Sequence, residues 1–182
     1  LSTLLGAKPA QVAPIFEVWP SGEAELWQAL VLGLRDYVRK NGFSKVVLGL
    51  SGGIDSAIVA AIAADALGPE NVHCLMLPYV YTSEESLADA RDCAVRLGVR
   101  YDVVPIGAPV DEALRELQPV FGNVAQDTTE ENIQSRMRGL VLMAVSNKTG
   151  AMLLTTGNKS EMAVGYATIY GDMNGGFNPI KD

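Results

Sequence analysis

The segment with the clearest potential for chemistry consists of Gly49, Leu50, Ser51, Gly52, Gly53, Ile54, Asp55 and Ser56. It follows a short apolar run and precedes an Ala-rich stretch, a pattern typical of a buried strand that leads into a helix. Gly52 and Gly53 permit a sharp turn and the close approach of a ligand. The helix N-terminus offers free backbone N–H groups and a positive dipole, and the serines add hydroxyl donors. This loop is therefore predicted to bind phosphate.

Two well-known nucleotide loops do not match this segment. The pattern GxxxxGK[ST] is absent, no lysine lies at the turn, and GxGxxG is absent as well. A lone SGG could simply be a tight turn with an ordinary helix cap. The full pattern SGGxDS between a strand and a helix favours a ligand site, because open α/β sheets bind ligands at the carboxyl ends of their strands.

Polar residues in two later segments could complete such a site. Asn132 and Arg136 are four residues apart on an expected helix and share one face, where Arg136 could pair with a carboxylate or phosphate. Taken alone, they favour a solvated helix face. Glu161 follows the last expected strand and, taken alone, would be a charge in the first turn of a helix. Paired with Asp55, it becomes a candidate Mg²⁺ ligand, since Mg²⁺ is often held by one or two carboxylates and phosphate oxygens.

Strands and helices are expected to alternate along the chain. Short apolar runs indicate the strands, and helical periodicity or Ala-rich composition indicates the helices. The expected strands are 45–50, 72–77, 101–106 and 151–155. The first expected helix starts after Ser21 and is ended by Asn41-Gly42, and the later ones are 54–67, 83–97, 110–117 and 129–147. Such alternation is typical of a parallel sheet with helices on both faces. We therefore predict a three-layer α/β/α doubly wound fold.

The first helix carries an apolar stripe that includes Leu26, Leu30 and Leu34. Their spacing of four residues places them on one face. This face could pack on the core or on a second subunit, and the core is favoured. Ser21 is expected to cap this helix, and one of the threonines at 128–129 is expected to cap the last one.

Size and composition restrict the classes of function. The chain has 182 residues, of which 48% are hydrophobic and 19% charged, which suits one folded domain. A net charge of −7 argues against a protein that holds nucleic acid mainly through phosphate contacts. No apolar run reaches the roughly 18 residues of a membrane span, and the first residues lack a signal-peptide pattern. We therefore expect neither nucleic acid nor a membrane as a partner.

Hydrolytic chemistry has few candidate residues in this chain. His73 is the only histidine, and its position in an expected strand favours packing over catalysis. A His-based catalytic triad would have to use it. Cys74 and Cys93 form no CxxC motif or Cys/His cluster, so both are expected to be reduced thiols that bind no metal.

Several segments resemble motifs of one enzyme superfamily. Residues 51–56 are similar to the signature loop of the ATP pyrophosphatases, which cleave ATP between its α and β phosphates. Residues 77–86 (LPYVYTSEES), 131–138 (ENIQSRMR) and 155–161 (TTGNKSE) resemble, in the same order, motifs of the NAD⁺ synthetases. The last of these has the form typical of glutamine-dependent members, and the triplet at 170–172 continues the match. The resemblance extends from about residue 20 to the end of the chain.

The resemblance implies an adenine nucleotide α-hydrolase-like fold and a ligase reaction in two steps. The nicotinic acid carboxylate of deamido-NAD⁺ would attack the α phosphate of ATP, forming an acyl-adenylate and releasing pyrophosphate. Ammonia would then attack the adenylate to give NAD⁺ and AMP. The resemblance also implies a cytoplasmic homodimer. A glutaminase domain outside these residues would supply the ammonia, because neither cysteine nor the histidine lies in an amidotransferase-like setting.

The resemblance also assigns residues to ligands. ATP is expected to bind Gly49, Leu50, Ser51, Gly52, Gly53, Ile54, Asp55, Ser56, Leu77 and Thr156. Deamido-NAD⁺ is expected to bind Asn132, Arg136 and Glu161. The Mg²⁺ ligands would be Asp55 and Glu161. Because catalysis would rest on positioning and charge stabilisation, no protein nucleophile is expected.

The chain departs from the family pattern in one position and divides into two parts. Ammonia-dependent relatives place a lysine before the Tyr-Gly-Asp triplet, where this sequence has Ile169, so that substrate contact is not carried over. Residues 1–20 contain three prolines and are interpreted as a linker or arm. Residues 21–182 are interpreted as the ATP pyrophosphatase domain, incomplete at its C-terminal end.

Two alternative functions stay open. One is another adenylating ATP pyrophosphatase, such as a GMP synthetase or a tRNA-thiolation enzyme, and the negative net charge weighs against tRNA. The other is a non-catalytic nucleotide-binding module on the same fold. Two carboxylates suited to a metal, Asp55 and Glu161, weigh against that module.

Overall fold

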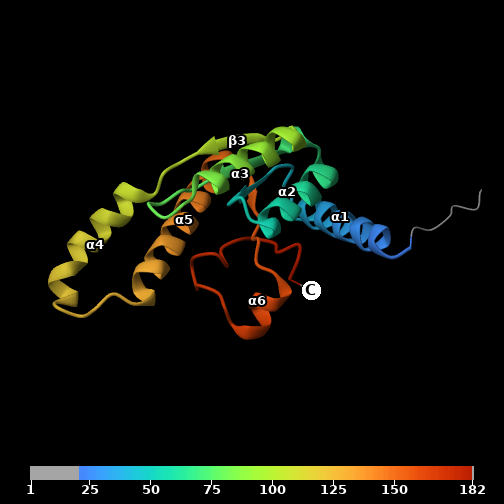
Figure 1. Cartoon of the computed structure of the whole chain (residues 1–182). Coiled ribbons are helices and arrows are strands. Elements are labelled where there is room, and N and C mark those ends of the chain that lie inside the picture. Colours follow the sequence, from blue (N-terminus) through green and yellow to red (C-terminus); the bar gives the residue numbers. More distant parts are fainter. Residues whose placement is uncertain (1–20, 182) are drawn as a thin grey trace, which may run out of the picture.

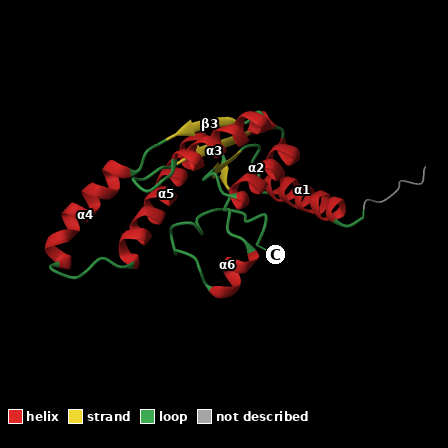
Figure 2. Cartoon of the chain, viewed as in Figure 1, coloured by secondary structure: helices red, strands yellow, loops and turns green. Residues whose placement is uncertain are grey.

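A four-stranded parallel sheet forms the centre of the molecule (Figures 1 and 2). The computed structural model describes residues 21–181, and the arm expected at 1–20 lies outside the described residues. The strand order is β3-β2-β1-β4. The strands are β1 (Val46–Gly49), β2 (Val72–Met76), β3 (Arg100–Val103) and β4 (Met152–Leu153).

Helices cover both faces of this sheet. One face carries α1 (Glu23–Lys40), α2 (Ile54–Leu67) and α3 (Glu84–Leu97). The other face carries α5 (Thr128–Thr149) and the start of α4 (Gly107–Phe121), and these two helices then run beside each other away from the sheet (Figure 1). The predicted three-layer α/β/α arrangement is confirmed. None of the helices in residues 21–181 combines the length and the hydrophobicity that crossing a membrane requires.

Side-chain alternation in β1 explains why both faces need a cover. Val46 and Leu48 point into the cluster beneath α1–α3, whereas Val47 points into the cluster beneath α5, and all three are buried. Helix α2 is closely packed on the first face, and its buried positions include Ala60, Ala63 and further alanines. Small side chains let the helix backbone approach the sheet closely, which positions the loop between β1 and α2.

The apolar stripe of α1 divides between core and surface. Leu34 is fully buried, which confirms the prediction that this face packs on the core, but Leu26 is 61% exposed, so the stripe does not reach the core over its whole length. Two hydrogen bonds fix α1 on α2: Trp27 Nε1 donates to Asp65 Oδ2 at 2.8 Å, and Arg35 Nε donates to the carbonyl of Ala66 at 2.9 Å.

Two of the expected helix caps are wrong. Gly22, not Ser21, is the N-cap of α1, and it makes no side-chain hydrogen bond. For α5 the N-cap is Asp127 rather than a threonine. The Asp127 carboxylate accepts from the backbone N–H of Thr129 at 2.8 Å, and the Glu130 carboxylate accepts from the backbone N–H of Asp127. Asp127 forms this capping box because the glutamate stands three residues after it.

In the second half of the chain, several helix and strand boundaries differ from those expected from the sequence. Helix α4 runs from 107 to 121, longer than the expected 110–117, while the third strand ends at Val103 rather than at 106. Helix α6 (Lys159–Val164) carries Glu161 in its first turn, the position that this residue indicates when taken alone. A capping box between Asn158 and Glu161 marks its start. By contrast, α2 has the expected bounds 54–67.

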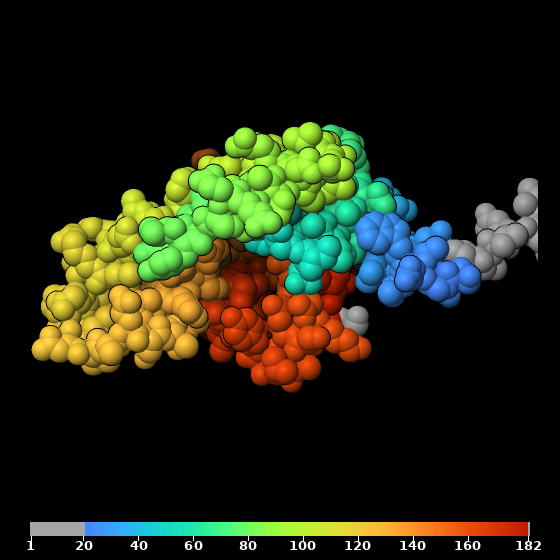
Figure 3. All heavy atoms as spheres, viewed as in Figure 1, coloured from blue at the N-terminus to red at the C-terminus, as the bar shows by residue number. Residues whose placement is uncertain are grey.

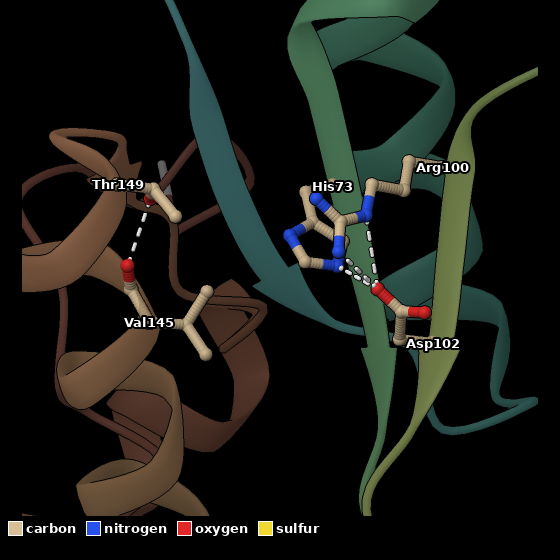
Figure 4. Close-up of polar contacts among 5 residues, drawn as sticks. All are labelled: His73, Arg100, Asp102, Val145 and Thr149. Atoms are coloured by element: carbon tan, nitrogen blue, oxygen red, sulfur yellow. Dashed lines mark hydrogen bonds and ion pairs between the residues drawn. The ribbon is translucent and has the colours of Figure 1, made fainter.

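His73 connects β2 to the edge strand β3. Its Nε2 lies 2.8 Å from Asp102 Oδ2, and Arg100 Nε donates to the same oxygen at 2.9 Å (Figure 4). Burial lowers the pKa of His73, and this effect exceeds the opposing hydrogen bond to Asp102, whose own pKa is lowered by Arg100 and His73. His73 lies near the amino ends of the strands, so it has a structural role, as expected.

The free energy of unfolding should therefore decrease on acidification in a window that His73 sets. Because the pKa of His73 is lower in the folded than in the unfolded chain, the unfolded state binds more protons as the pH falls through about 6.5. His73→Gln should remove this component, and Asp102 titrates at lower pH. Urea unfolding at pH 7.5 and 5.5 measures both proteins. Equal losses of stability in the wild type and the variant would contradict the assignment.

Candidate functional site

The order of the strands creates a crevice at the carboxyl ends of β1 and β4. From β1 the chain proceeds to β2 and β3 on one side, and β4 then pairs with the other side of β1. The connections after β1 and β4 therefore separate from each other, which is the point where open α/β sheets bind ligands. The two loops meet through Asn158, whose Nδ2 donates to Asp55 Oδ2 at 3.3 Å.

The loop predicted to bind phosphate, residues 49–56 and called the phosphate loop from here on, is shaped by its own serines. Ser56 is buried, and its Oγ accepts from the backbone N–H of Ser51 at 3.1 Å and donates to the carbonyl of Gly53 at 2.9 Å. Ser51 Oγ accepts from the backbone N–H of Gly53 at 3.2 Å. These bonds hold the loop in one conformation before any ligand contact, so the hydroxyls position the backbone donors as well as offering donors of their own.

Gly52 and Gly53 have different structural roles in the loop. Gly52 has a φ of +85°, and a Cβ there would lie 2.5 Å from the carbonyl oxygen of Ser86. The turn and the packing against α3 therefore require this glycine, rather than the approach of a ligand. Gly53 is the N-cap of α2 with a φ of −81°, and a Cβ there would meet Ser51 Oγ at 3.3 Å. Gly53 faces the open side of the loop.

Two cavities lie beside this loop. The larger one has a volume of about 790 Å³ and is bounded by the phosphate loop, α1, the loop after β4 and the segment 166–181, which we call the C-terminal strap. Figure 3 shows the surface hollowed between α2 and this red segment. The smaller cavity has a volume of about 440 Å³ and lies over the ends of β1 and β2. The two cavities share Ser51, Thr155, Thr156 and Asp172.

The smaller cavity contains five of the residues that the family resemblance assigns to ATP. They are Gly49, Leu50, Ser51, Leu77 and Thr156. Arg138 of α5, which was not among the expected site residues, also lines it. Arg138 Nε donates to the carbonyl of Leu77 at 3.2 Å, and burial lowers its pKa. None of the carboxylates in the described residues forms an ion pair with it. A desolvated cation without an acidic partner suits a cavity for an anion or for polar groups of a nucleotide.

Asn132 and Arg136 lie outside both cavities. Asn132 Oδ1 accepts from Thr168 Oγ1 at 2.8 Å, and Arg136 Nε donates to the carbonyl of Ile169 at 3.2 Å. These contacts fasten the C-terminal strap to α5. The face of α5 that reaches the smaller cavity consists instead of Ser135, Arg138, Gly139 and Leu142. Their spacing of three and four residues is the signal that could have identified this face. The assignment of Asn132 and Arg136 to deamido-NAD⁺ stays a prediction.

Two further members of the predicted set do not line either cavity. Ile54 is 70% exposed at the start of α2, and Gly52 is turned toward α3. Their positions in the loop are therefore explained by local structure. The remaining loop residues, Ser51, Gly53, Asp55 and Ser56, line the larger cavity.

Asp55 and Glu161 lie on the wall of the same larger cavity although 105 residues separate them. Asn158 bridges them: its Nδ2 bonds to Asp55, its backbone N–H donates to Glu161 Oε2 at 3.0 Å, and its Oδ1 accepts from the backbone N–H of Glu161 at 2.9 Å. Within residues 21–181 no group of three or more His, Cys, Asp or Glu side chains could hold a metal. Two carboxylates with phosphate oxygens fit the ligand preference of Mg²⁺.

The C-terminal strap closes the larger cavity by close backbone packing on β4. Gly176 N–H donates to the carbonyl of Leu153 at 2.8 Å, and the N–H of Thr155 donates to the carbonyl of Phe177 at 3.0 Å. A Cβ on Gly175 would lie 2.4 Å from Thr155 Cγ2. Adjacent glycines therefore permit the strap to lie against the strand that carries the site.

These features define a domain of the adenine nucleotide α-hydrolase-like type, with a phosphate loop at the switch point of a doubly wound sheet. The family model described as NAD synthase matches residues 26–182. The chain belongs to the NAD synthase family.

Individual relatives agree with this membership. A glutamine-dependent NAD(+) synthetase from Rhodobacter capsulatus is 63% identical over 178 residues, which cover 97% of this chain and 32% of the relative. The structure of a glutamine-dependent NAD+ synthetase from Acinetobacter baumannii in complex with ADP has a TM-score of 0.86 at 51% identity, covering 94% of this chain and 32% of that one. An NMN synthetase from Francisella tularensis has a TM-score of 0.82 at 27% identity, covering 90% and 66%. The chain spans about a third of the length of its first curated relatives.

Substitutions at the two loop glycines should separate ligand binding from folding. Gly53→Val should weaken ATP binding at least tenfold, equivalent to about 1.4 kcal/mol, because the side chain blocks approach to the backbone donors. Its melting temperature should stay close to that of the wild type. Gly52→Ala should lower the melting temperature by about 5 °C or more, since it strains a left-handed residue against α3. Calorimetry with ATP and thermal unfolding measure both, and unchanged ATP affinity in folded Gly53→Val would refute the loop assignment.

Proposed function

We propose that this chain carries the ATP-dependent step of NAD⁺ synthesis, the amidation of deamido-NAD⁺ to NAD⁺ with release of AMP and pyrophosphate. The observation that carries the proposal is the contact of Asn158 with both Asp55 and Glu161, which joins the phosphate loop to the loop after β4 at one cavity. Membership of the NAD synthase family and the names of the closely similar relatives support it. A coupled assay for AMP, pyrophosphate and NAD⁺ with deamido-NAD⁺, ATP and ammonium tests it.

The proposed reaction uses the two cavities in different ways. The nucleoside of ATP would occupy the smaller cavity near Leu77 and Arg138, and its phosphates would extend over the loop toward the larger one. The substrate carboxylate would attack the α phosphate where the cavities join, near Ser51 and Thr156. The N–H groups at the start of α2 would stabilise the charge that develops on the leaving pyrophosphate. Ammonia would then displace AMP from the acyl-adenylate.

Mg²⁺ is a proposed part of this site. Asp55 and Glu161 would hold it, and their shared contact to Asn158 keeps both carboxylates at the wall of the larger cavity. The ion would neutralise charge on the phosphates of ATP. Asn158 itself would act by orienting the two carboxylates, because its side-chain and backbone N–H groups each donate to one of them.

The nitrogen source is proposed to be glutamine, hydrolysed by a glutaminase domain outside these residues. A thiol nucleophile needs a low pKa. Burial instead raises the pKa of Cys74 to about 12 and raises that of Cys93 as well. His73 is engaged with Asp102 away from the cavities. The described residues therefore offer no activated thiol for glutamine hydrolysis.

The size of the acceptor is the point on which a second candidate function depends. Asn132 and Arg136, which the family resemblance assigns to the dinucleotide, lie outside both cavities of one chain. This favours either a homodimer that completes the dinucleotide site, which we propose, or a smaller acceptor such as nicotinic acid mononucleotide. The likeness to a protein named NMN synthetase accords with the second candidate. Comparison of kcat/KM for the two acceptors distinguishes them.

Removal of one carboxylate charge should impair turnover. Asp55→Asn should lower the rate of NAD⁺ formation at least about 100-fold, the scale of losing one electrostatic stabiliser. Asp65→Asn is a matched control on the same helix, because Asp65 contacts Trp27 and lines neither of the two cavities. Near-normal turnover of Asp55→Asn at saturating ATP and ordinary Mg²⁺ would remove the support for its proposed role.

The two thiols should be dispensable for nitrogen transfer. The assay uses the protein that includes the proposed glutaminase domain. There, Cys74→Ala combined with Cys93→Ala should leave the ratio of glutamine-dependent to ammonium-dependent NAD⁺ formation unchanged, because neither sulfur is an activated nucleophile. The ammonium-dependent rate of the same protein controls for any loss of stability. A selective loss of the glutamine-dependent rate would show that glutamine hydrolysis uses a thiol of this chain.

A further inference from the structure

The hydroxyl of Thr155 is buried, but it has no hydrogen-bond partner among the described residues. Thr155 is only 7% exposed, and among the buried side-chain nitrogens and oxygens of residues 21–181 its Oγ1 is the one without a hydrogen-bond partner. Buried hydroxyls are normally paired, because an unpaired one loses its hydration without compensation. An exception of this kind calls for a reason in the function of the site.

Packing accounts for the shape of this residue but not for its oxygen. The backbone N–H of Thr155 donates to the carbonyl of Phe177, and its methyl group lies against Gly175 of the C-terminal strap. A valine would fill the same space and would leave no polar atom unpaired. The threonine therefore weakens the fold slightly at this position, and the hydroxyl is the only part of the side chain that packing does not use.

The position of Thr155 connects it with both cavities. It lines the larger and the smaller one, next to Ser51 and Thr156. Its methyl group faces Gly175, which also lines the larger cavity. The oxygen itself is covered by protein, but one rotation about the Cα–Cβ bond moves the hydroxyl into the place of the methyl group, while the methyl group takes the place of the Cβ hydrogen. That movement turns the hydroxyl toward Gly175, which lines the larger cavity, without any change in the backbone.

We propose that the Thr155 hydroxyl turns to donate a hydrogen bond to the α phosphate of the bound nucleotide. The proposal rests on the proposed function, in which the nucleoside occupies the smaller cavity while pyrophosphate and the attacking carboxylate occupy the larger one. The α phosphate is the group that must lie where the two cavities join, and Thr155 is at that junction. An unpaired hydroxyl gains a strong bond to a charged oxygen there, so the interaction favours the bound state.

Three variants separate this role from a structural one. Thr155→Val keeps the shape and removes the hydroxyl, and Thr155→Ser keeps the hydroxyl and removes the methyl group. Thr149→Val is the matched control, since the hydroxyl of Thr149 donates to the carbonyl of Val145 at 2.7 Å within α5 (Figure 4). Calorimetry with AMP, adenosine and inorganic pyrophosphate, together with thermal unfolding, is carried out on the purified protein and each variant.

Thr155→Val is expected to lower the affinity for AMP and to raise the melting temperature. Thr155→Val should bind AMP about tenfold more weakly, the scale of one hydrogen bond to a charged group, with unchanged affinity for adenosine and pyrophosphate. Its melting temperature should rise by about 2–4 °C, because the unpaired oxygen is gone. Thr155→Ser should keep the AMP affinity and melt at a lower temperature. Thr149→Val should bind AMP as the wild type does and show no gain in melting temperature.

Other outcomes would overturn the inference. Unchanged AMP affinity in Thr155→Val would refute the phosphate contact, while leaving the proposed function intact. An equal loss of adenosine affinity, or a loss of pyrophosphate affinity instead, would place the hydroxyl at a different group and refute it too. If the wild-type protein binds none of ATP, AMP and pyrophosphate, the proposed function itself fails, and this inference fails with it.

Discussion

The contact between the phosphate loop and the loop after β4 is the interaction on which the site depends. Parallel strands place both loops at the same edge of the sheet, but at a switch point they separate, and something must join them. Asn158 does so by donating to Asp55 with its side chain and to Glu161 with its backbone N–H. Two carboxylates that would otherwise repel each other are thereby held at one cavity, where a cation or a cationic group can bind between them.

Close backbone packing provides the second constraint. Gly52 lies against the first turn of α3, and Gly175 and Gly176 lie against β4, so the walls of the site are formed by main chain as much as by side chains. Such walls move little, because any added Cβ meets backbone or a fixed side chain. The positions of the phosphate loop and the C-terminal strap are therefore set by the fold, and the ligand meets a largely preformed site.

Two polar groups that this packing leaves without a full set of protein partners indicate where a ligand binds. Arg138 is desolvated without an acidic partner among the described residues, and Thr155 keeps a buried hydroxyl unpaired within residues 21–181. Both features weaken the isolated fold, and both lie on the walls of the cavities. Departures from the best packing at a ligand site are expected where a bound group supplies the missing partner.

The sequence by itself determined the alternation of strands and helices, the bounds of α2, the phosphate loop and the three-layer fold, because these follow from local periodicity and from turn residues. It also identified Asp55 and Glu161 as a pair, and the structure places both on one cavity. Only the tertiary structure decided which face of α5 reaches the cavities, where Arg138 lies and Asn132 and Arg136 do not. It also decided that Gly52 serves helix packing and that Thr155 lacks a partner. These depend on the rotation of a helix and on contacts between distant segments, which no local pattern encodes.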